Sequence, residues 1–89
     1  MVVERPVPIR VKVLYFGQAK EAAGRAEEDF SLPGASSVLT LVSRSIKAHQ
    51  ELRRMSSVIR FAVNEEIAGE DDRLADGDVV AFLPPVAGG

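Results

Sequence analysis

The sequence predicts an α+β domain in which one main helix packs across a mixed sheet. Several short segments are rich in the β-branched and aromatic residues that favour strands. One longer segment, 36–55, instead has apolar residues at the three- and four-residue spacing of an amphipathic helix. The chain has 89 residues, of which 46% are hydrophobic, so it fits one small domain with its own core. Strands predominate over one substantial helix, and the helix is therefore expected to cover one face of the sheet.

The first half of the chain is predicted to form a strand, a short helix and an edge strand. Residues 1–8 are a loose lead-in, because their two prolines prevent regular pairing. Residues 9–17 form a strand whose two faces differ. Residues 18–24 form a short helix that stops at Gly24, and 26–34 form an edge strand that ends at a Pro-Gly turn. In the first strand, one face carries Ile9, Val11, Val13 and Tyr15, and the other carries Arg10, Lys12, Leu14 and Phe16.

The segment 36–55 is predicted to be the main helix. Ser36 or Ser37 can cap its first free N–H groups. The basic side chains in its last turns suit the negative end of the helix dipole. Its apolar stripe comprises Val38, Leu41 or Val42, and Ile46.

Two further strands complete the predicted sheet. Residues 58–68 form a strand with a plausible tight turn at Asn64–Glu65, 69–78 form a polar connection, and 78–85 form the last strand. The helix should cover the inner face. The other face keeps an apolar spot near the end of the domain, which suggests a partner surface. We place Val11, Val13, Phe61, Val80 and Phe82 on the inner face, and Phe16, Ala81 and Leu83 at the uncovered spot.

Composition excludes several classes of function. The net charge is −2 and no basic tract is present, so nucleic acid is not an expected ligand. The chain has no cysteine, which excludes disulfides and thiolate chemistry on its own side chains. We see neither a signal peptide nor a membrane-spanning run, and we expect a soluble cytoplasmic protein with no membrane partner.

The titratable residues do not form a recognisable site. His49 is the only histidine, so we expect no metal site and interpret His49 as a helix-surface residue. The acidic residues between Glu65 and Asp78 lack the spacing of a calcium loop and are interpreted as solvated loop charge. The serines fit caps and helix surface, and no phosphate-binding motif is present.

The terminal segment "PPVAGG" has the properties of a reactive end. Pro84 and Pro85 cannot donate to a sheet, so they end the strand and direct the chain outward. Gly88 and Gly89 lack side chains and can enter a narrow slot. A last residue that is activated as an acyl adenylate becomes a good electrophile. The alternative is an ordinary terminus that happens to contain two glycines.

The segments "VKVLYFGQAKEAAG", "FAVNEE" and "LADGDVVAFLPPVAGG" resemble the small subunit of molybdopterin synthase, the MoaD type within the MoaD/ThiS sulfur carriers. The similarity extends from about residue 10 to residue 89 in the order of the elements. It implies a β-grasp, ubiquitin-like fold for residues 9–85 and a flexible reactive tail at 86–89. The tail residues to be threaded into a partner are Pro85, Val86, Ala87 and Gly88.

The resemblance also implies a chemistry. An E1-like adenylyltransferase would activate Gly89 with ATP and Mg²⁺, and a sulfur-donating enzyme would convert it to a thiocarboxylate. The large subunit would accept the tail and pass the sulfur to cyclic pyranopterin monophosphate, which makes the chain a non-catalytic sulfur donor with no bound cofactor. A heterotetramer of two small and two large subunits is expected. Phe16, Ala81, Leu83 and the rim residue Lys20 would contact the partner.

Other functions remain open at the level of sequence. The same tail suits a sulfur carrier for thiamine, cysteine or tRNA thiolation. It also suits a ubiquitin-like modifier that is joined to lysines through Gly89, and the fold suits a plain interaction module.

Overall fold

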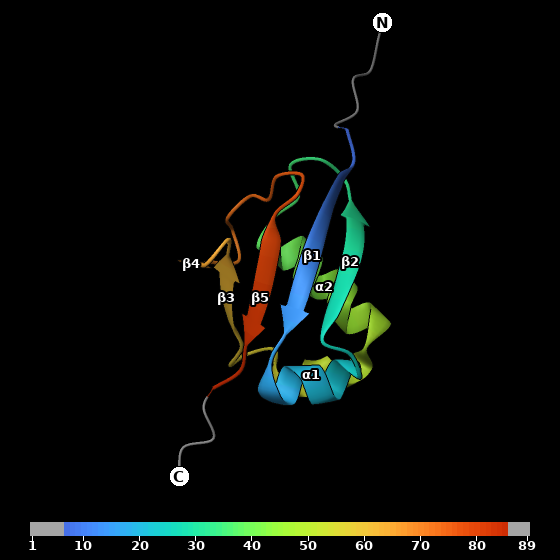
Figure 1. Ribbon diagram of the computed structural model, residues 1–89, viewed down its shortest axis with the longest axis vertical. Helices are drawn as coiled ribbons and strands as arrows, with labels where there is room; N and C mark the ends of the chain where they lie inside the picture. The colour runs from blue at the N-terminus through green and yellow to red at the C-terminus, as the bar shows by residue number, and fades with distance from the viewer. Residues whose placement is uncertain (1–6, 86–89) are drawn as a thin grey trace, which may run out of the picture.

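The computed structural model describes residues 7–85 and contains one five-stranded mixed sheet. The strands lie in the order β2-β1-β5-β3-β4 (Figure 1). The central strands β1 (Ile9–Tyr15) and β5 (Val79–Leu83) are parallel to each other. The remaining pairs are antiparallel and join β2 (Glu27–Leu32) to β1, β3 (Arg60–Val63) to β5, and β4 (Glu66–Ala68) to β3. The expected α+β fold and the expected edge position of β2 are both confirmed.

In the described part of the chain, two α-helices and a 3₁₀ helix accompany the sheet. The short helix α1 (Gly17–Ala23) lies at the end of the sheet where β1 and β5 finish (Figure 1). It stops at Gly24, which adopts the left-handed conformation (φ 72°) and donates its N–H to the Lys20 carbonyl at 2.9 Å. The main helix α2 (Val38–Ala48) is followed by the 3₁₀ helix η1 (Gln50–Met55). Of the two predicted caps for α2, Ser37 is the observed one, since its side chain accepts from the Thr40 N–H.

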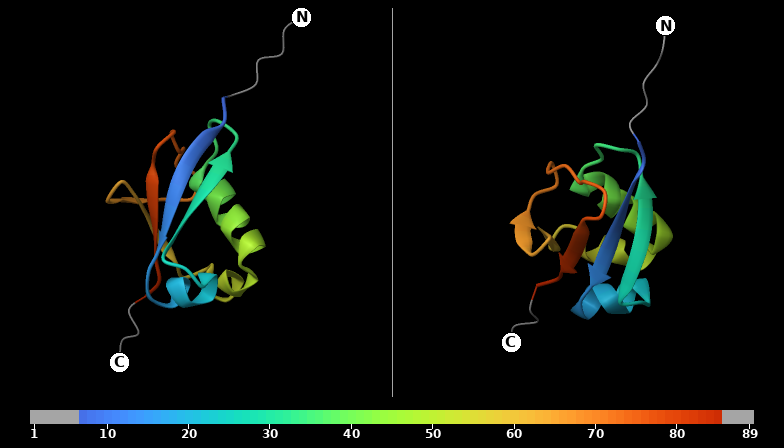
Figure 2. Two further views of the ribbon diagram at one scale, coloured as in Figure 1. Left: turned by 45° about the vertical axis from the view of Figure 1, so that its right-hand side comes forward. Right: turned by 45° about the horizontal axis from the view of Figure 1, so that its top comes forward.

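The core lies between α2 and one face of the sheet. Turning the molecule shows α2 crossing behind the strands, whereas no helix formed by residues 7–85 covers the opposite face (Figure 2). Val38 and Leu41 of α2 are fully buried, as is Val80 in the middle of β5. All five residues predicted for the inner face are buried: Val11, Val13, Phe61, Val80 and Phe82.

The predicted single helix over 36–55 is wrong in its second half. The α-helix ends at Ala48, and His49 leaves the helical conformation (φ −137°, ψ 88°) before η1 begins. The break redirects the chain, and it allows Leu52 to be fully buried. Helical spacing alone does not reveal this change, because a 3₁₀ turn and an α-turn have similar apolar patterns over six residues.

The connection between β4 and β5 is more ordered than its polar sequence suggests. Leu74 is buried in the core, and its N–H donates to the Ser36 carbonyl. Asp76 accepts from the Arg10 N–H, and Asp72 accepts from the Gly69 N–H. Within residues 7–85, no three His, Cys, Asp or Glu side chains gather as metal ligands do. In the same part of the chain, no helix has the length and apolar character that crossing a membrane requires.

Candidate functional site

The face of the sheet that α2 leaves uncovered carries a row of apolar side chains. The strand register places Leu14 of β1 beside Ala81 of β5, Ala81 beside Ala62 of β3, and Ala62 beside Ile67 of β4. Because paired residues on neighbouring strands point to the same side, the four form a continuous line across the sheet. Ile67 at the edge is 70% exposed. We call this side of the sheet the open face.

A groove runs along the open face over the central strands β1, β5 and β3. Two side chains predicted for a partner surface, Phe16 and Leu83, stand at one end of it, and the third, Ala81, lies at its centre. Phe16 is 46% exposed, and together with the apolar residues beside it in the groove it forms a contiguous exposed apolar patch, which is typical of a binding surface. The groove is lined by Leu14, Phe16, Ala62, Asn64, Glu65, Val79, Ala81 and Leu83.

Lys20, the predicted rim residue, does not line this groove. It lies exposed on α1, beyond the end of β1. A contact between Lys20 and a partner would therefore lie outside the apolar groove. Its predicted role stays a prediction.

The chain leaves the domain at the same end of the groove as Phe16. β5 is a central strand and ends at Leu83. Pro84 then packs near the start of α1, because a Cβ built on Gly17 would stand 3.3 Å from the Pro84 Cγ. Pro85 is exposed. The predicted tail residues Val86, Ala87, Gly88 and Gly89 lie outside the described residues.

A tight turn closes the opposite end of the groove. Asn64 and Glu65 connect β3 to β4, and both have positive φ, 51° and 72°. The Asn64 side chain anchors the turn to β5, since its amide donates to Asp78 Oδ1 at 2.9 Å and its Oδ1 accepts from the Val79 N–H at 3.0 Å. The turn itself was predicted from sequence, whereas its place at the groove was not.

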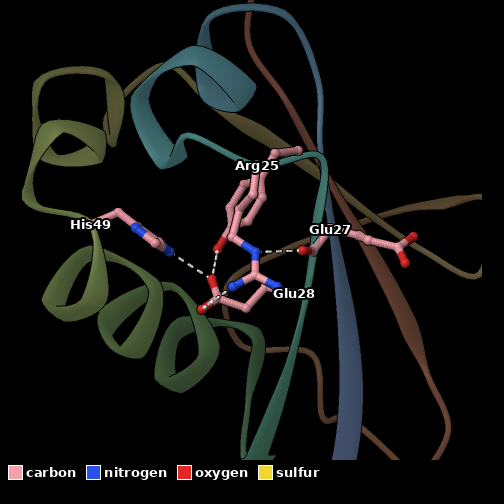
Figure 3. A network of polar contacts seen from close by, with 5 residues as sticks. Arg25, Glu27, Glu28 and His49 are labelled. Carbon is pink, nitrogen blue, oxygen red and sulfur yellow. Dashed lines mark hydrogen bonds and ion pairs between the residues drawn. The ribbon is translucent and has the colours of Figure 1, made fainter.

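A polar cluster lies between β2 and the end of α2 (Figure 3). Glu28 of β2 is its centre. The Tyr15 hydroxyl donates to Glu28 Oε1 at 2.9 Å, and His49 Nε2 lies 2.7 Å from the same oxygen. Arg25 approaches the other carboxylate oxygen at 3.6 Å. The interpretation of His49 as a helix-surface residue is therefore wrong: its side chain is largely buried and joins the break after α2 to β2.

Burial has the largest effect on the pKa of Tyr15 in this cluster. Burial raises the pKa of the Tyr15 phenol above its ordinary value, and the nearby Ser45 hydroxyl opposes this effect. The hydrogen bond to Glu28 and its negative charge raise that pKa further. The phenol therefore stays protonated and acts as a donor inside the domain. These contacts join β1, β2 and the end of α2, and none of the residues that make them lines the groove.

Sequence reasoning assigned three of the eight groove residues, Phe16, Ala81 and Leu83, to a partner surface. The other five were not assigned to it, because a small residue or a lone charge in a strand pattern gives no signal of its own. The available signal is position. Ala62 alternates with Phe61 and Val63, and Val79 alternates with Val80, so both belong to the face opposite the core.

Comparison with known proteins supports the resemblance noted in the sequence. The model of the ThiS family matches residues 13–89. A molybdopterin synthase sulfur carrier subunit from Mycobacterium tuberculosis is 39% identical over 82 residues, covering 91% of this chain and 99% of the relative. One of the same name from Chlamydomonas reinhardtii is 37% identical over 83 residues, covering 91% of this chain and 100% of the relative.

Solved structures agree on the fold. SAMP1 from Haloferax volcanii has a TM-score of 0.80 at 27% identity, covering 90% of this chain and 99% of that one. A chain in the complex of subunits 1 and 2 of the molybdopterin-converting factor from Helicobacter pylori has a TM-score of 0.63 at 30% identity, covering 91% of this chain and 100% of that one. The expected β-grasp fold is confirmed by these ubiquitin-like neighbours. The chain belongs to the ThiS family, and the curated relatives it resembles carry the name molybdopterin synthase sulfur carrier subunit.

Proposed function

We propose that this chain is the sulfur-carrier subunit of molybdopterin synthase and that Gly89 carries the sulfur as a thiocarboxylate. The observation that carries the proposal is the family match, which includes β5 and continues through the Gly-Gly pair to residue 89. The geometry supports it. The last described residues leave the domain beside an exposed apolar groove, which is where a partner that receives the tail would need to bind.

The chemistry needs a partner at every step. The Gly89 carboxylate attacks the α-phosphorus of ATP and releases pyrophosphate, which leaves an acyl adenylate. A sulfur nucleophile, supplied by the sulfur-donating enzyme, then replaces AMP. The thiocarboxylate sulfur forms a C–S bond to cyclic pyranopterin monophosphate, and water then hydrolyses the resulting thioester, which leaves the sulfur on the pterin and returns Gly89 to a carboxylate. ATP and Mg²⁺ are bound by the E1-like enzyme, and the acid and base groups of the last step belong to the large subunit.

Docking through the groove offsets the cost of ordering the tail. Fixing one residue of backbone costs about 1–2 kcal/mol, so four residues after Pro85 would cost about 4–8 kcal/mol. Four small residues cannot recover this by their own contacts. Burying a large apolar side chain such as Phe16 or Leu83 contributes about 1.5–3 kcal/mol before association costs. The groove is therefore expected to supply much of the affinity.

Deletion of Gly89 tests the proposal directly. The chain is incubated with the E1-like enzyme, ATP, Mg²⁺ and the sulfur donor, and its intact mass is measured. The unaltered chain should gain the mass difference between sulfur and oxygen. The deletion variant should not gain it, because its terminal carboxylate, now on Gly88, falls one residue short of the site where the E1-like enzyme activates it. The far-UV circular dichroism of both chains should be the same. Normal thiocarboxylate formation in the deletion variant would refute the proposal.

A ubiquitin-like modifier is the second candidate, and the structural similarity to SAMP1, a small archaeal modifier protein, favours it. The same mass measurement on material from the native host separates the two. A lysine-linked conjugate through Gly89 indicates a modifier. A thiocarboxylate together with co-purification of the large subunit indicates the molybdopterin pathway, whereas a thiocarboxylate without that subunit indicates another sulfur pathway. Cytoplasmic location stays a prediction that cell fractionation would check.

A further inference from the structure

Glu65 is the one charged side chain among the residues that line the groove. Its neighbours there are apolar, apart from Asn64, whose side chain is bound to β5. Within residues 7–85, the Glu65 carboxylate makes no hydrogen bond or ion pair. An acidic group is thus held at the rim of an apolar surface without a counter-charge from the described part of its own chain.

The backbone conformation at Glu65 is one that glycine usually adopts. A two-residue hairpin turn with positive φ at both positions favours glycine at the second one. Here that position is Glu65, with φ 72°. The left-handed conformation is unfavourable for a residue with a Cβ. The strain at Asn64 is compensated by its side-chain bonds to Asp78 and Val79, but within the described chain no such bond compensates it at Glu65.

Glu65 stands at the opposite end of the groove from the tail exit. Phe16 and Leu83 mark the exit end, and the Asn64–Glu65 turn lies next to Val79 at the start of β5. The five residues of β5 span about 13 Å between these ends. A partner that contacts both ends has only one direction in which it can dock, with the receiving site for the tail beside Phe16.

We infer that Glu65 determines the specificity and orientation of docking by pairing with an arginine or lysine on the otherwise apolar docking surface of the large subunit. This inference rests on the proposed function and adds a chemical requirement on the partner. The apolar contacts supply affinity, and the charge pair speeds association and disfavours the reversed orientation. The partner's matching surface should therefore be apolar, with one basic side chain at the end distant from its active site.

The test compares Glu65→Lys with Glu66→Lys. Both variants change the net charge from −2 to zero. Glu66 is exposed, pairs with Val63 in the β3–β4 ladder and lies outside the groove, so it is a matched control. Association of each full-length chain with the large subunit is followed by stopped flow. At low ionic strength, Glu65→Lys should slow association roughly tenfold, and Glu66→Lys less than about twofold. Glu65→Gln should lie between wild type and Glu65→Lys.

Salt dependence and thermal stability provide the remaining controls. The difference between the two lysine variants should shrink at about 1 M salt, where the screening length is about 3 Å. Equal effects of Glu65→Lys and Glu66→Lys would overturn the inference, while wild-type association would still support the proposed function. Failure of the wild-type chain to associate with the large subunit would overturn both. Equal melting temperatures of the two lysine variants exclude misfolding as the cause.

Discussion

At the scale of single residues, several polar side chains of this domain hold its elements together. Asn64 fixes the turn beside the groove, and Asp78 holds both Asn64 and the Ala75 N–H. Tyr15 and His49 share one oxygen of Glu28. Burying such groups is costly unless they are paired, so each pair also fixes the relative positions of the elements that carry it.

Tyr15 gives a prediction about stability at high pH. Its pKa is raised in the folded protein, so above pH 10, near the ordinary tyrosine pKa of about 10, the unfolded chain loses the phenolic proton and the folded chain keeps it. The free energy of unfolding should therefore fall as pH rises above about 10. Tyr15→Phe should be less stable at neutral pH by about 0.5–1.5 kcal/mol, because a hydrogen bond is lost. Its stability should depend less steeply on pH above about 10.

Urea unfolding at several pH values measures both effects. Tyr15 is the only tyrosine, so phenolate absorbance in the near ultraviolet also follows its ionisation without interference. Ionisation of the folded protein near pH 10 would contradict the burial of this hydroxyl. If the free energy of unfolding of Tyr15→Phe depends on pH in the same way as that of wild type, the loss of stability at high pH comes from other groups.

At the scale of elements, successive side chains of β5 point alternately into the core and into the groove, so different residues of one strand serve stability and binding. Val80 and Phe82 point into the core, whereas Val79, Ala81 and Leu83 line the groove. The strand lies between β1 and β3 in the sheet, so both of its backbone edges are paired. One five-residue strand thereby carries part of the core, part of the groove and the start of the exit segment.

Alanine substitutions in the core and in the groove should affect different properties. Phe82→Ala removes a fully buried ring that contacts Tyr15 and Phe61, and should cost about 3–5 kcal/mol of stability. Leu83→Ala and Phe16→Ala should leave the melting temperature nearly unchanged and weaken binding to the large subunit. Thermal unfolding and titration calorimetry measure the two properties. A large loss of stability in Leu83→Ala would place that residue in the core.

At the scale of the whole molecule, one face of the sheet forms the core and the other carries the groove. One face is covered by α2 and forms the core, and the other is bare apart from its own side chains (Figure 2). The groove joins the open face to the exit of the chain. This arrangement suits one partner at a time, because any protein that takes up the tail would meet the same apolar surface.

The assembly expected from the resemblance can be tested at this scale. One open face per chain leads us to expect one small subunit for each large subunit. Light scattering of the mixed subunits should then give the mass of two small and two large chains. Glycine replaced by a bulky residue at 89 should leave this mass unchanged if the groove supplies most of the affinity. Dissociation of that variant would instead assign the affinity to the tail.

The sequence by itself determined the fold class, the alternation of the strands and the terminal motif. These features depend on local periodicity and residue type, which are visible in the printed chain. Phe16, Ala81 and Leu83 could be grouped because alternation places them on one face. The break at His49 and the burial of Leu74 could not be foreseen, since each depends on a partner distant in sequence: Glu28 for the first and Ser36 for the second.

Only the tertiary structure decided which side chains are neighbours on the open face. Ala62 and Leu14 become neighbours of Ala81 through the order β1-β5-β3, in which strands from both ends of the chain lie side by side. The same order brings the Asn64–Glu65 turn to the end of the groove opposite Phe16. Strand order is set by how the whole chain buries its apolar area, and no local pattern contains that information.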